Sequence, residues 1–531
     1  MQLERTIGLL GLTFVVVSGI IGSGWLFAPF LASQVAGPAA IISWFIGGFS
    51  ILILALCFAE TTSILPVAGA IAKLPHFTHG DVTSSVLGWS AWVGYNTAAP
   101  IETIAMLEYL DPWLFKGAAQ DGNLTQSGIL VAWAILAFFV VVNAWGISAF
   151  VRANLWITVV KLLVPTVIPI VIIFLHFTPS NFYSSGFAPN GMKGVFTAVS
   201  TGGVIFAFIG FRHAIDLAGE VKRPNFTIPV ALTSGLIICV VIYVLLQIAF
   251  IGGLNPKEIE NGWADMLLQG KGAKAAAVPM MSVVAALGIG WVNVMLYTGA
   301  VVAPFGGGLV ATGSMARLGY ALSQNGFFPK WLEKLSTRGV PLRALVMNFV
   351  FGVAVVAFIS FEEAIAFNGA AITISLCAGP LAVVALRKQL PDLARPFRLP
   401  AVYIIAPVSF VVATLIVYWG GWETNWRLGL VIGVGLVIFA IKTVWNRVPV
   451  SHLDLPQAIW LIPYGVGLLT FSYLGDFGGG TKRLVYPWDT IGVVILSLGV
   501  FVIAYRCRLS NEATARYCEK YMTLPPDVTP L

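Results

Sequence analysis

A chain of 531 residues, of which 58% are hydrophobic and only 10% charged, with a mean hydropathy of +0.89, cannot bury its apolar side chains inside one soluble core. Its formal net charge is +7, and its basic residues are scattered over the connections between apolar runs. This distribution argues against a nucleic-acid surface and fits a protein surrounded by lipid. Five cysteines stand in or beside apolar runs without paired spacing, which predicts packing residues and neither a disulfide framework nor a metal site.

The apolar runs follow one another along the whole chain, and each is long enough to cross about 30 Å of hydrocarbon as a helix. No small-residue cleavage site follows the first run, so it is expected to be retained. We predict an all-α polytopic membrane protein with fourteen transmembrane helices, at residues 8–34, 38–60, 83–110, 127–146, 153–176, 192–220, 229–251, 290–318, 341–360, 363–387, 400–419, 427–446, 457–474 and 488–506. Residues 254–289 carry charges and then a short apolar piece, which predicts an external loop ending in a re-entrant or interfacial helix.

Lysine and arginine are distributed unevenly over the connections. With the N-terminus inside, twenty of these 30 residues fall in inner segments and seven in outer ones. Because cytoplasmic loops hold the excess of basic residues, we expect a multi-pass protein of the inner (plasma) membrane with cytoplasmic N- and C-termini.

Two of the runs contain glycines at mid-depth, where a spanning helix can least tolerate interruption. The stretches are "SGIIGSGW", with Gly19, Gly22 and Gly24, and "STGGVIFAFIGFRHA", with Gly202, Gly203 and Gly210. Irregular backbone at that depth needs protein or a cavity around it, and a pair of interrupted helices indicates a transporter's substrate site. Close packing of glycines between helices explains the same residues without a site.

Two cations fall within predicted spans, Lys161 in "WITVVKLLVPTV" and Arg212 in "FAFIGFRHAIDLAGE". Each would cost at least about 2.5 kcal/mol in lipid, so each is expected to face the protein interior or a water-filled cavity. Lys161 lies about 12 Å into its helix, a long reach to a headgroup, which favours a functional role. For Arg212, an i, i+4 pair with Asp216 is an equally good explanation.

At these residues the sequence resembles the amino acid–polyamine–organocation (APC) permeases. The resemblance covers roughly residues 5–400 and rests on five features in the family's order: "SGIIGSGW", Lys161 midway along the fifth helix, "FAFIGFRHAIDLAGEVKRPNFTIP", "SMARLGYALSQNGFFPKWL" and "LRKQLPDLARPFRLP". It implies a transporter core at 1–400, built from two inverted five-helix repeats at approximately 5–176 and 192–400, with helices 1 and 6 broken at a central site. Residues 401–531 would add further transmembrane helices and a short cytoplasmic tail.

The resemblance also implies roles for single residues. The backbone N–H groups of Gly22, Ser23 and Gly24, with the Ser23 hydroxyl, would bind the substrate carboxylate. The α-amino group would be faced by Ile20 and by the carbonyls of Phe206, the gating aromatic, and Ile209.

Lys161 matches the lysine that, in proton-coupled members, takes the place of the ion bound by sodium-coupled relatives. A lysine removed from water between helices 1 and 5 can exchange its proton and so bias the two access states. The proton gradient, with no cofactor, would then drive transport.

The sequence departs from the family pattern in the sixth helix. Arg212 stands where the family usually has Glu, and Gly219 replaces the first of two acidic residues, which leaves Glu220. A cation beside the site repels cationic substrates and can pair with a side-chain carboxylate. We therefore predict proton-coupled symport of a small neutral or acidic amino acid, with aspartate or glutamate favoured. Pairing of Arg212 with Asp216 or Glu220 would remove that preference.

Two other functions remain open from the residues, and an enzyme is not expected. An amino acid exchanger of the same fold would differ only in its dependence on internal substrate. A non-transporting nutrient sensor usually carries an appended signalling domain, whereas only about 25 residues follow the last span. An enzyme would need clustered acids, bases or metal ligands at membrane depth, and the five histidines are dispersed. Glu102, beside Pro100 in the third helix, either lines the pathway or sits near its outer end.

Overall fold

The computed structural model describes residues 5–115, 117–120, 123–145, 147–266, 279–359, 361–447, 449 and 452–522. Within these ranges the regular elements are helices, apart from one small hairpin of β1 (Ala119–Gln120) and β2 (Asn123–Leu124), which pair antiparallel, and an isolated bridge between Ile7 and Val221. This confirms the predicted all-α fold class.

The N-terminal part of the chain forms six helices. They are α1 (Leu9–Ile20), α2 (Gly24–Ala36), α3 (Ala40–Ile64), α4 (Ala70–Leu110), α5 (Gln126–Ala144) and α6 (Ile147–Leu175). Thr125 shows how local chemistry starts such a helix, since its hydroxyl accepts from the Gly128 N–H and caps α5.

The middle of the chain begins with a segment divided into three short helices and continues mainly with longer helices. Its helices are α7 (Gly191–Ser200), α8 (Val204–Phe208), α9 (Arg212–Asp216), α10 (Pro224–Gly253), α12 (Pro279–Ala286), α13 (Gly290–Gln324), α14 (Leu342–Phe358), α15 (Phe361–Leu376) and α16 (Ala378–Gln389). Pro224 stands at the first position of α10, where its missing N–H costs nothing.

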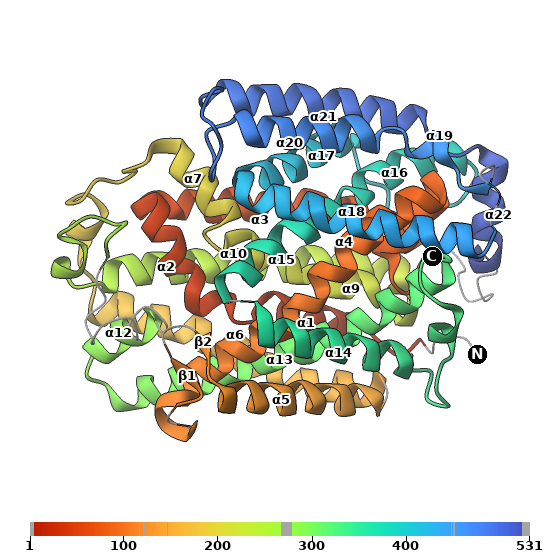
Figure 1. Ribbon diagram of the computed structural model, residues 1–531. Helices are drawn as coiled ribbons and strands as arrows, with labels where there is room; N and C mark the ends of the chain where they lie inside the picture. Colours follow the sequence, from red (N-terminus) through yellow and green to blue (C-terminus); the bar gives the residue numbers. More distant parts are fainter. Residues whose placement is uncertain are drawn as a thin grey trace.

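The C-terminal part adds helices that lie together along one side of the molecule, where α20 and α21 form the upper edge of Figure 1, opposite α5. They are α17 (Val402–Trp419), α18 (Gly421–Trp445), α19 (Leu455–Ala458), α20 (Leu461–Leu474), α21 (Trp488–Arg506) and α22 (Asn511–Met522). Short 3₁₀ turns cover Gly37–Ala39, Pro179–Phe182, Ile209–Phe211, Ala218–Glu220, Pro256–Ile259 and Lys330–Glu333, and a π turn covers Asp111–Phe115.

Ten helical stretches among the described residues are long and apolar enough to cross a membrane, with Gly24–Ile64 counted as one, or eleven if the bent pair 191–200 and 204–216 is included. Two further apolar helices, α1 and α14, are shorter. Each of the fourteen predicted segments contains helical structure, with boundaries that differ by several residues.

Helices of the first five segments pack against their counterparts in the second five. The most extensive contacts join α4 to α13 and α3 to α10, that is, the third segment to the eighth and the second to the seventh. The contact of α4 with α15 is matched by that of α13 with α6.

The prediction that 61–82 is a connection was wrong, because α4 already starts at Ala70 and continues through a backbone break at Gly80, where φ is +80°. The polar residues before that break are buried under C-terminal elements: the Thr78 carbonyl accepts from the Leu509 N–H and His79 Nε2 contacts the Ala504 carbonyl. The Asp454 side chain fills the space that a Cβ at Gly80 would need. Contacts with distant segments therefore make this polar stretch part of the core.

Three further details add to the prediction. Cys377 interrupts the tenth segment between α15 and α16. The tail after residue 506 forms α22, which packs against α4 and α16. Of the stretch 254–289, the structure shows a 3₁₀ turn and the eight-residue helix α12, while 267–278 lie outside the described residues.

Candidate functional site

The first segment leaves helical geometry at the point where its glycines lie. Helix α1 ends at Ile20 and α2 begins at Gly24, and both ends are buried. The last helical bond before the gap runs from the Ile21 N–H to the Val17 carbonyl, and the next turn closes from Leu26 to Ser23. Between them, the Gly22 N–H bonds to the Ile20 carbonyl at 2.9 Å, while the Ser23 N–H points out of the helix and bonds to a side chain, as the first N–H groups of a helix can.

The sixth segment is interrupted in a similar way. Helix α7 ends at Ser200, and Gly203 follows with a φ of +82°, a conformation that favours glycine. The chain bends there by 41°, and Ile209–Phe211 then separate α8 from α9 as a 3₁₀ turn.

The two interrupted segments touch through their backbones. A Cβ placed on Gly19 would lie 2.6 Å from the carbonyl oxygen of Gly210, and one on Gly210 would overlap the backbone of Gly19. A Cβ on Gly24 would meet that of Ala207 at 3.0 Å. The sequence left two explanations for these glycines, close packing between helices and interruption of a helix. At these two segments both occur together.

A narrow cavity lies between these segments. Its lining consists of Gly19, Ile20, Gly24, Ala98, Glu102, Phe206, Ile209, Gly210, Arg212, His213, Gly307, Ala311 and Asn368. Its volume of about 20 Å³ is room for one water molecule. The cavity is thus too small for an amino acid, which can enter only when the surrounding helices move apart.

Five of the residues predicted for substrate binding line this cavity: Ile20, Gly24, Phe206, Ile209 and Arg212. The other three predicted site residues, Gly22, Ser23 and Lys161, are buried beside it, and Glu102 links them to the cavity.

Glu102, on α4, is the side chain at the gap between α1 and α2. Its Oε2 accepts a hydrogen bond of 2.7 Å from the Ser23 N–H. The absence of a side chain at Gly22 and Gly307 gives the carboxyl its space, since a Cβ at either position would run into it. The chain's own carboxylate thus occupies the place predicted for the substrate carboxylate. Sequence reasoning weighed Glu102 only weakly, although an acidic residue within a span was its signal.

Lys161, on α6, is fully buried, and its ammonium donates a hydrogen bond of 2.5 Å to the Ser18 carbonyl in the last turn of α1. Gly306 on α13 makes room for the end of its side chain. Lys161 and Glu102 also interact electrostatically, without a direct ion pair. The lysine therefore joins the fifth segment to the interruption of the first.

Arg212 is buried, with 2% of its surface exposed, and its guanidinium lies 4.1 Å from the centre of the Tyr95 ring. Nη1 donates to the Ile209 carbonyl at 3.2 Å. The i, i+4 ion pair with Asp216 is not formed between these two described side chains, although their charges interact. Glu220 pairs with Arg317 of α13 instead, at 2.5 Å.

The carbonyls predicted to face the α-amino group are partly occupied. The Ile20 carbonyl accepts from the Tyr243 hydroxyl at 2.8 Å, and the Ile209 carbonyl accepts from Arg212. Asn368 of α15 also lines the cavity: its amide nitrogen donates to Gly94 and Thr97, and its buried Oδ1 has no hydrogen-bond partner among the described residues. Sequence reasoning missed Asn368, whose signal was an amide within an apolar run.

No group of three or more His, Cys, Asp or Glu side chains in the described part of the chain could hold a metal ion. The site therefore offers backbone N–H groups, a buried guanidinium, a buried ammonium, a carboxylate and an unoccupied amide oxygen. Such a set can hold a zwitterion and exchange a proton.

Comparison with known proteins agrees with this chemistry. The sequence profile described as "Amino acid permease" matches residues 7–464. The chain is 34% identical to the glutamate/serine transporter AimA of Bacillus subtilis, over 96% of this chain and 95% of the relative. It is 33% identical to the aspartate-proton symporter of the same organism, over 96% and 98% of the two chains. The arginine/ornithine antiporter ArcD1 of Lactococcus lactis is more distant, at 24% identity over 95% and 97%.

Proposed function

The chain belongs to the amino acid permease family and is a multi-pass membrane transporter, and we propose that it carries a small amino acid inward together with protons, with aspartate or glutamate preferred. The preference for acidic substrates rests on one observation above all. Arg212 is a buried guanidinium at the cavity without a carboxylate partner in the described structure.

The charge of Asp216 acts on Arg212 without a direct ion pair, and a buried guanidinium that no carboxylate contacts is costly, so its retention needs a reason. A substrate carboxylate in the cavity would supply the missing anion, and the planar guanidinium can bind it in two-point geometry. Glu220 forms its ion pair with Arg317, so it does not neutralise Arg212, and Arg212 remains available to a substrate carboxylate. The relatives named for glutamate, serine and aspartate transport agree with this preference.

The α-carboxylate of the substrate binds at the start of α2. The hydrogen bond that the Ser23 N–H donates to Glu102 supports this, because a carboxylate already lies at this helix end. Substrate binding then requires Glu102 to move away or to be protonated, since two carboxylates cannot share the same N–H groups without repulsion. Gly22 and Gly24 flank the same helix end.

The α-ammonium of the substrate binds on the opposite side, near α8 and α15. The Phe206 carbonyl, the Phe206 ring and the unoccupied Oδ1 of Asn368 are the proposed contacts. The carbonyls of Ile20 and Ile209 join them only if Tyr243 and Arg212 turn away when the site opens.

Lys161 is the proposed proton-coupling residue. As an ammonium it donates strongly to the Ser18 carbonyl and holds α6 against α1; as a neutral amine it donates more weakly. Gain or loss of the proton therefore changes how firmly the first segment is tied, and so biases which side of the membrane the cavity faces.

We further propose cytoplasmic N- and C-termini in the plasma membrane, with a transporter core at 1–400. The excess of basic residues in the inner connections supports the orientation. In the C-terminal part, α17 packs on α3 and α18 on α4, which suits a role in bracing the core.

Uptake of labelled amino acids into proteoliposomes, with and without an inward proton gradient, tests the proposal. Aspartate or glutamate should accumulate only with the gradient, and arginine and lysine should compete poorly. Accumulation that depends on internal amino acid and ignores the gradient would instead identify an exchanger. Preference for cationic amino acids would contradict the role of Arg212.

A further inference from the structure

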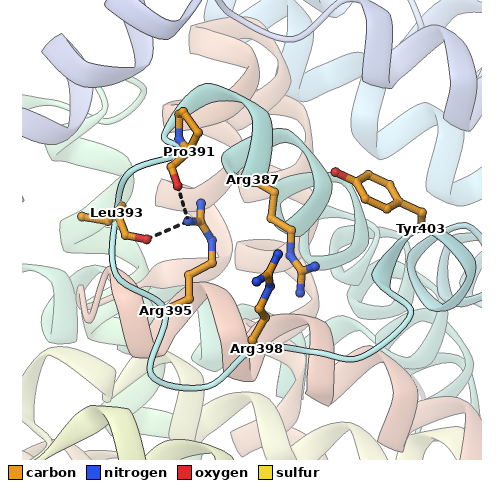
Figure 2. A pocket seen from close by; sticks show the side chains of 6 residues that line it. All are labelled: Arg387, Pro391, Leu393, Arg395, Arg398 and Tyr403. Atoms are coloured by element: carbon orange, nitrogen blue, oxygen red, sulfur yellow. Dashed lines mark hydrogen bonds between the residues drawn. The ribbon is translucent and has the colours of Figure 1, made fainter. Parts of the chain in front are cut away.

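A second cavity lies where α16 ends and α17 begins, far along the chain from the central site. It has a volume of about 280 Å³ and is lined by Arg387, Pro391, Leu393, Arg395, Arg398 and Tyr403. Figure 2 shows the side chains of Arg387 and Arg398 directed toward the same space, with Tyr403 beside them. Three of the six lining residues are arginines, which sets this cavity apart from the apolar surroundings.

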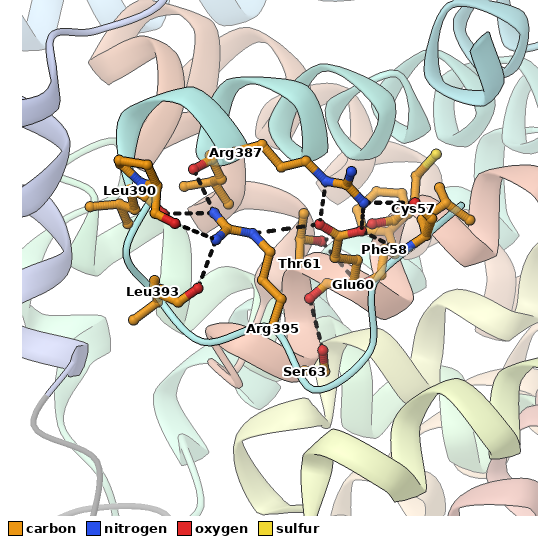
Figure 3. A network of polar contacts seen from close by, with 12 residues as sticks. Cys57, Phe58, Glu60, Thr61, Ser63, Arg387, Leu390, Leu393 and Arg395 are labelled. Carbon is orange, nitrogen blue, oxygen red and sulfur yellow. Dashed lines mark hydrogen bonds and ion pairs between the residues drawn. The ribbon is translucent and has the colours of Figure 1, made fainter. Parts of the chain in front are cut away.

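The only carboxylate that contacts these arginines in the described structure is that of Glu60, on α3, and it is fully engaged (Figure 3). Its oxygens accept from Arg387 at 2.8 and 2.6 Å, and Oε2 also accepts from the Leu399 N–H at 2.7 Å. Glu60 is 1% exposed. Glu60 therefore pairs closely with Arg387 and more loosely with Arg395, and it ties the loop 390–401 to α3 through Leu399, but its single negative charge cannot balance three arginines.

Arg395 is engaged mainly with the end of α16. Its guanidinium donates to the carbonyls of Leu386, Leu390 and Leu393 at 2.9, 2.7 and 2.7 Å, while its Nε stays 3.7 Å from Glu60. These carbonyls would otherwise lack partners at the helix end. Burial is the main factor that lowers the pKa of Arg395, and the charges of Arg387 and Arg398 act in the same direction.

Arg398 has no hydrogen-bond or ion-pair partner among the described residues, and its side chain is exposed. The loop's own acidic residue, Asp392, does not line the cavity. Three arginines around one carboxylate leave an excess of two positive charges in this hollow. Such an arrangement attracts an anion with several acceptor oxygens.

The cavity also borders the surface of α17 that faces away from the protein. Tyr403 is 64% exposed and Ile404 68%, and Val408, one turn further on, is 44% exposed. A tyrosine followed by exposed aliphatic side chains is typical of the membrane–water interface, where the aliphatic side chains meet acyl chains and the ring meets headgroups. A phospholipid lying along α17 would bring its phosphate to the arginines.

We propose that this cavity is a binding site for a phosphate group, carried by an anionic phospholipid headgroup or by a soluble phosphate compound. Arg398 and the unengaged Nη1 of Arg387 are the donors, with the Tyr403 hydroxyl at the rim. Because the same loop is tied to α3 through Glu60, the bound phosphate stabilises the junction of α3, α16 and α17. This site is independent of the proposed transport mechanism.

The test uses the purified full chain in a neutral detergent and follows its thermal unfolding midpoint at constant ionic strength. The three probes are short-chain phosphatidylglycerol, phosphatidylcholine and inorganic phosphate. We expect phosphatidylglycerol or inorganic phosphate to raise the midpoint in a saturable way, and phosphatidylcholine to do so less. Arg398→Gln should raise the half-saturating concentration about tenfold, as expected for loss of one charge-assisted hydrogen bond. Tyr403→Phe should produce a smaller shift in the same direction.

Arg338→Gln is the matched control, since Arg338 is also exposed and lies in a connection expected on the same side of the membrane, outside the cavity. It should leave the half-saturating concentration unchanged. Saturation by the lipid alone identifies a headgroup site, and saturation by inorganic phosphate identifies a soluble ligand. Equal effects of Arg398→Gln and Arg338→Gln, or saturation by none of the probes, would overturn the proposal.

Discussion

The ammonium of Lys161, in α6, donates to the carbonyl of Ser18, two residues before α1 ends at Ile20. This contact connects a residue that can exchange a proton with the segment whose interruption builds the central site. It gives the proposed coupling a definite physical form, because a change of charge on α6 acts directly on α1.

Replacement of Lys161 by alanine should abolish uptake driven by a proton gradient and leave exchange of internal for external substrate largely intact. The reason is that exchange requires the site to alternate only while loaded, without a protonation step. Uphill accumulation and counterflow in proteoliposomes measure the two activities separately. Lys193→Ala is the control, since Lys193 is partly exposed and pairs with Asp476 at 2.8 Å away from the site. Uphill uptake by Lys161→Ala at the wild-type rate would contradict the assignment.

Glu102→Gln keeps an oxygen that can accept from the Ser23 N–H but removes the charge that competes with the substrate carboxylate. We expect the KM for substrate to change less with external pH than in the wild type, since the residue no longer titrates. The initial rate of uptake as a function of pH checks this. Glu363→Gln, which alters an exposed carboxylate, should retain the wild-type profile. An unaltered profile in Glu102→Gln would contradict the proposed competition between Glu102 and the substrate carboxylate.

Gly210→Ala should destabilise the protein by about 1–3 kcal/mol, the usual cost of overpacking, because the new methyl group would overlap the backbone of Gly19. Gly433→Ala in α18 meets no atom within 4 Å and should be neutral or slightly stabilising. Thermal unfolding of both variants in detergent makes the comparison. Equal stability would indicate that the first and sixth segments do not touch as described.

The Glu220–Arg317 ion pair, with side chains only 2% and 6% exposed, should be essential for stability. Removal of one partner, as in Glu220→Gln, leaves a buried cation and should cost about 3–5 kcal/mol. The exposed pair Arg427–Glu363 gives the contrast, since Arg427→Gln should change stability by less than about 1 kcal/mol. Chemical or thermal unfolding of the two variants tests the difference.

Much of the fold could be predicted from the sequence, because a lipid bilayer requires long apolar helices and makes isolated charges energetically costly. The helical class and the positions of Lys161 and Arg212 within spans followed from that constraint, whereas the family followed from the resemblance of five motifs. The buried polar stretch before Gly80 could not, because its burial depends on contacts with Leu509 and Ala504, more than 400 residues away.

The site itself was only partly predictable for the same reason. The glycines indicated where helices could end. They did not indicate that the Glu102 side chain, from another helix, would occupy the space beside Gly22. The sequence could not show whether Arg212 pairs with an acidic residue of its own segment. The answer depends on Arg317, which lies on a different helix and forms an ion pair with Glu220.

The most direct test of the acidic-substrate proposal is the ratio of binding affinities for aspartate and its uncharged isostere asparagine, measured on the wild type and on Arg212→Gln by competition against a labelled substrate. We expect the wild type to prefer aspartate and Arg212→Gln to lose that preference by about 30-fold or more, the effect of removing one partner of a buried charge pair. An aspartate-to-asparagine ratio that is the same in both proteins would contradict the account.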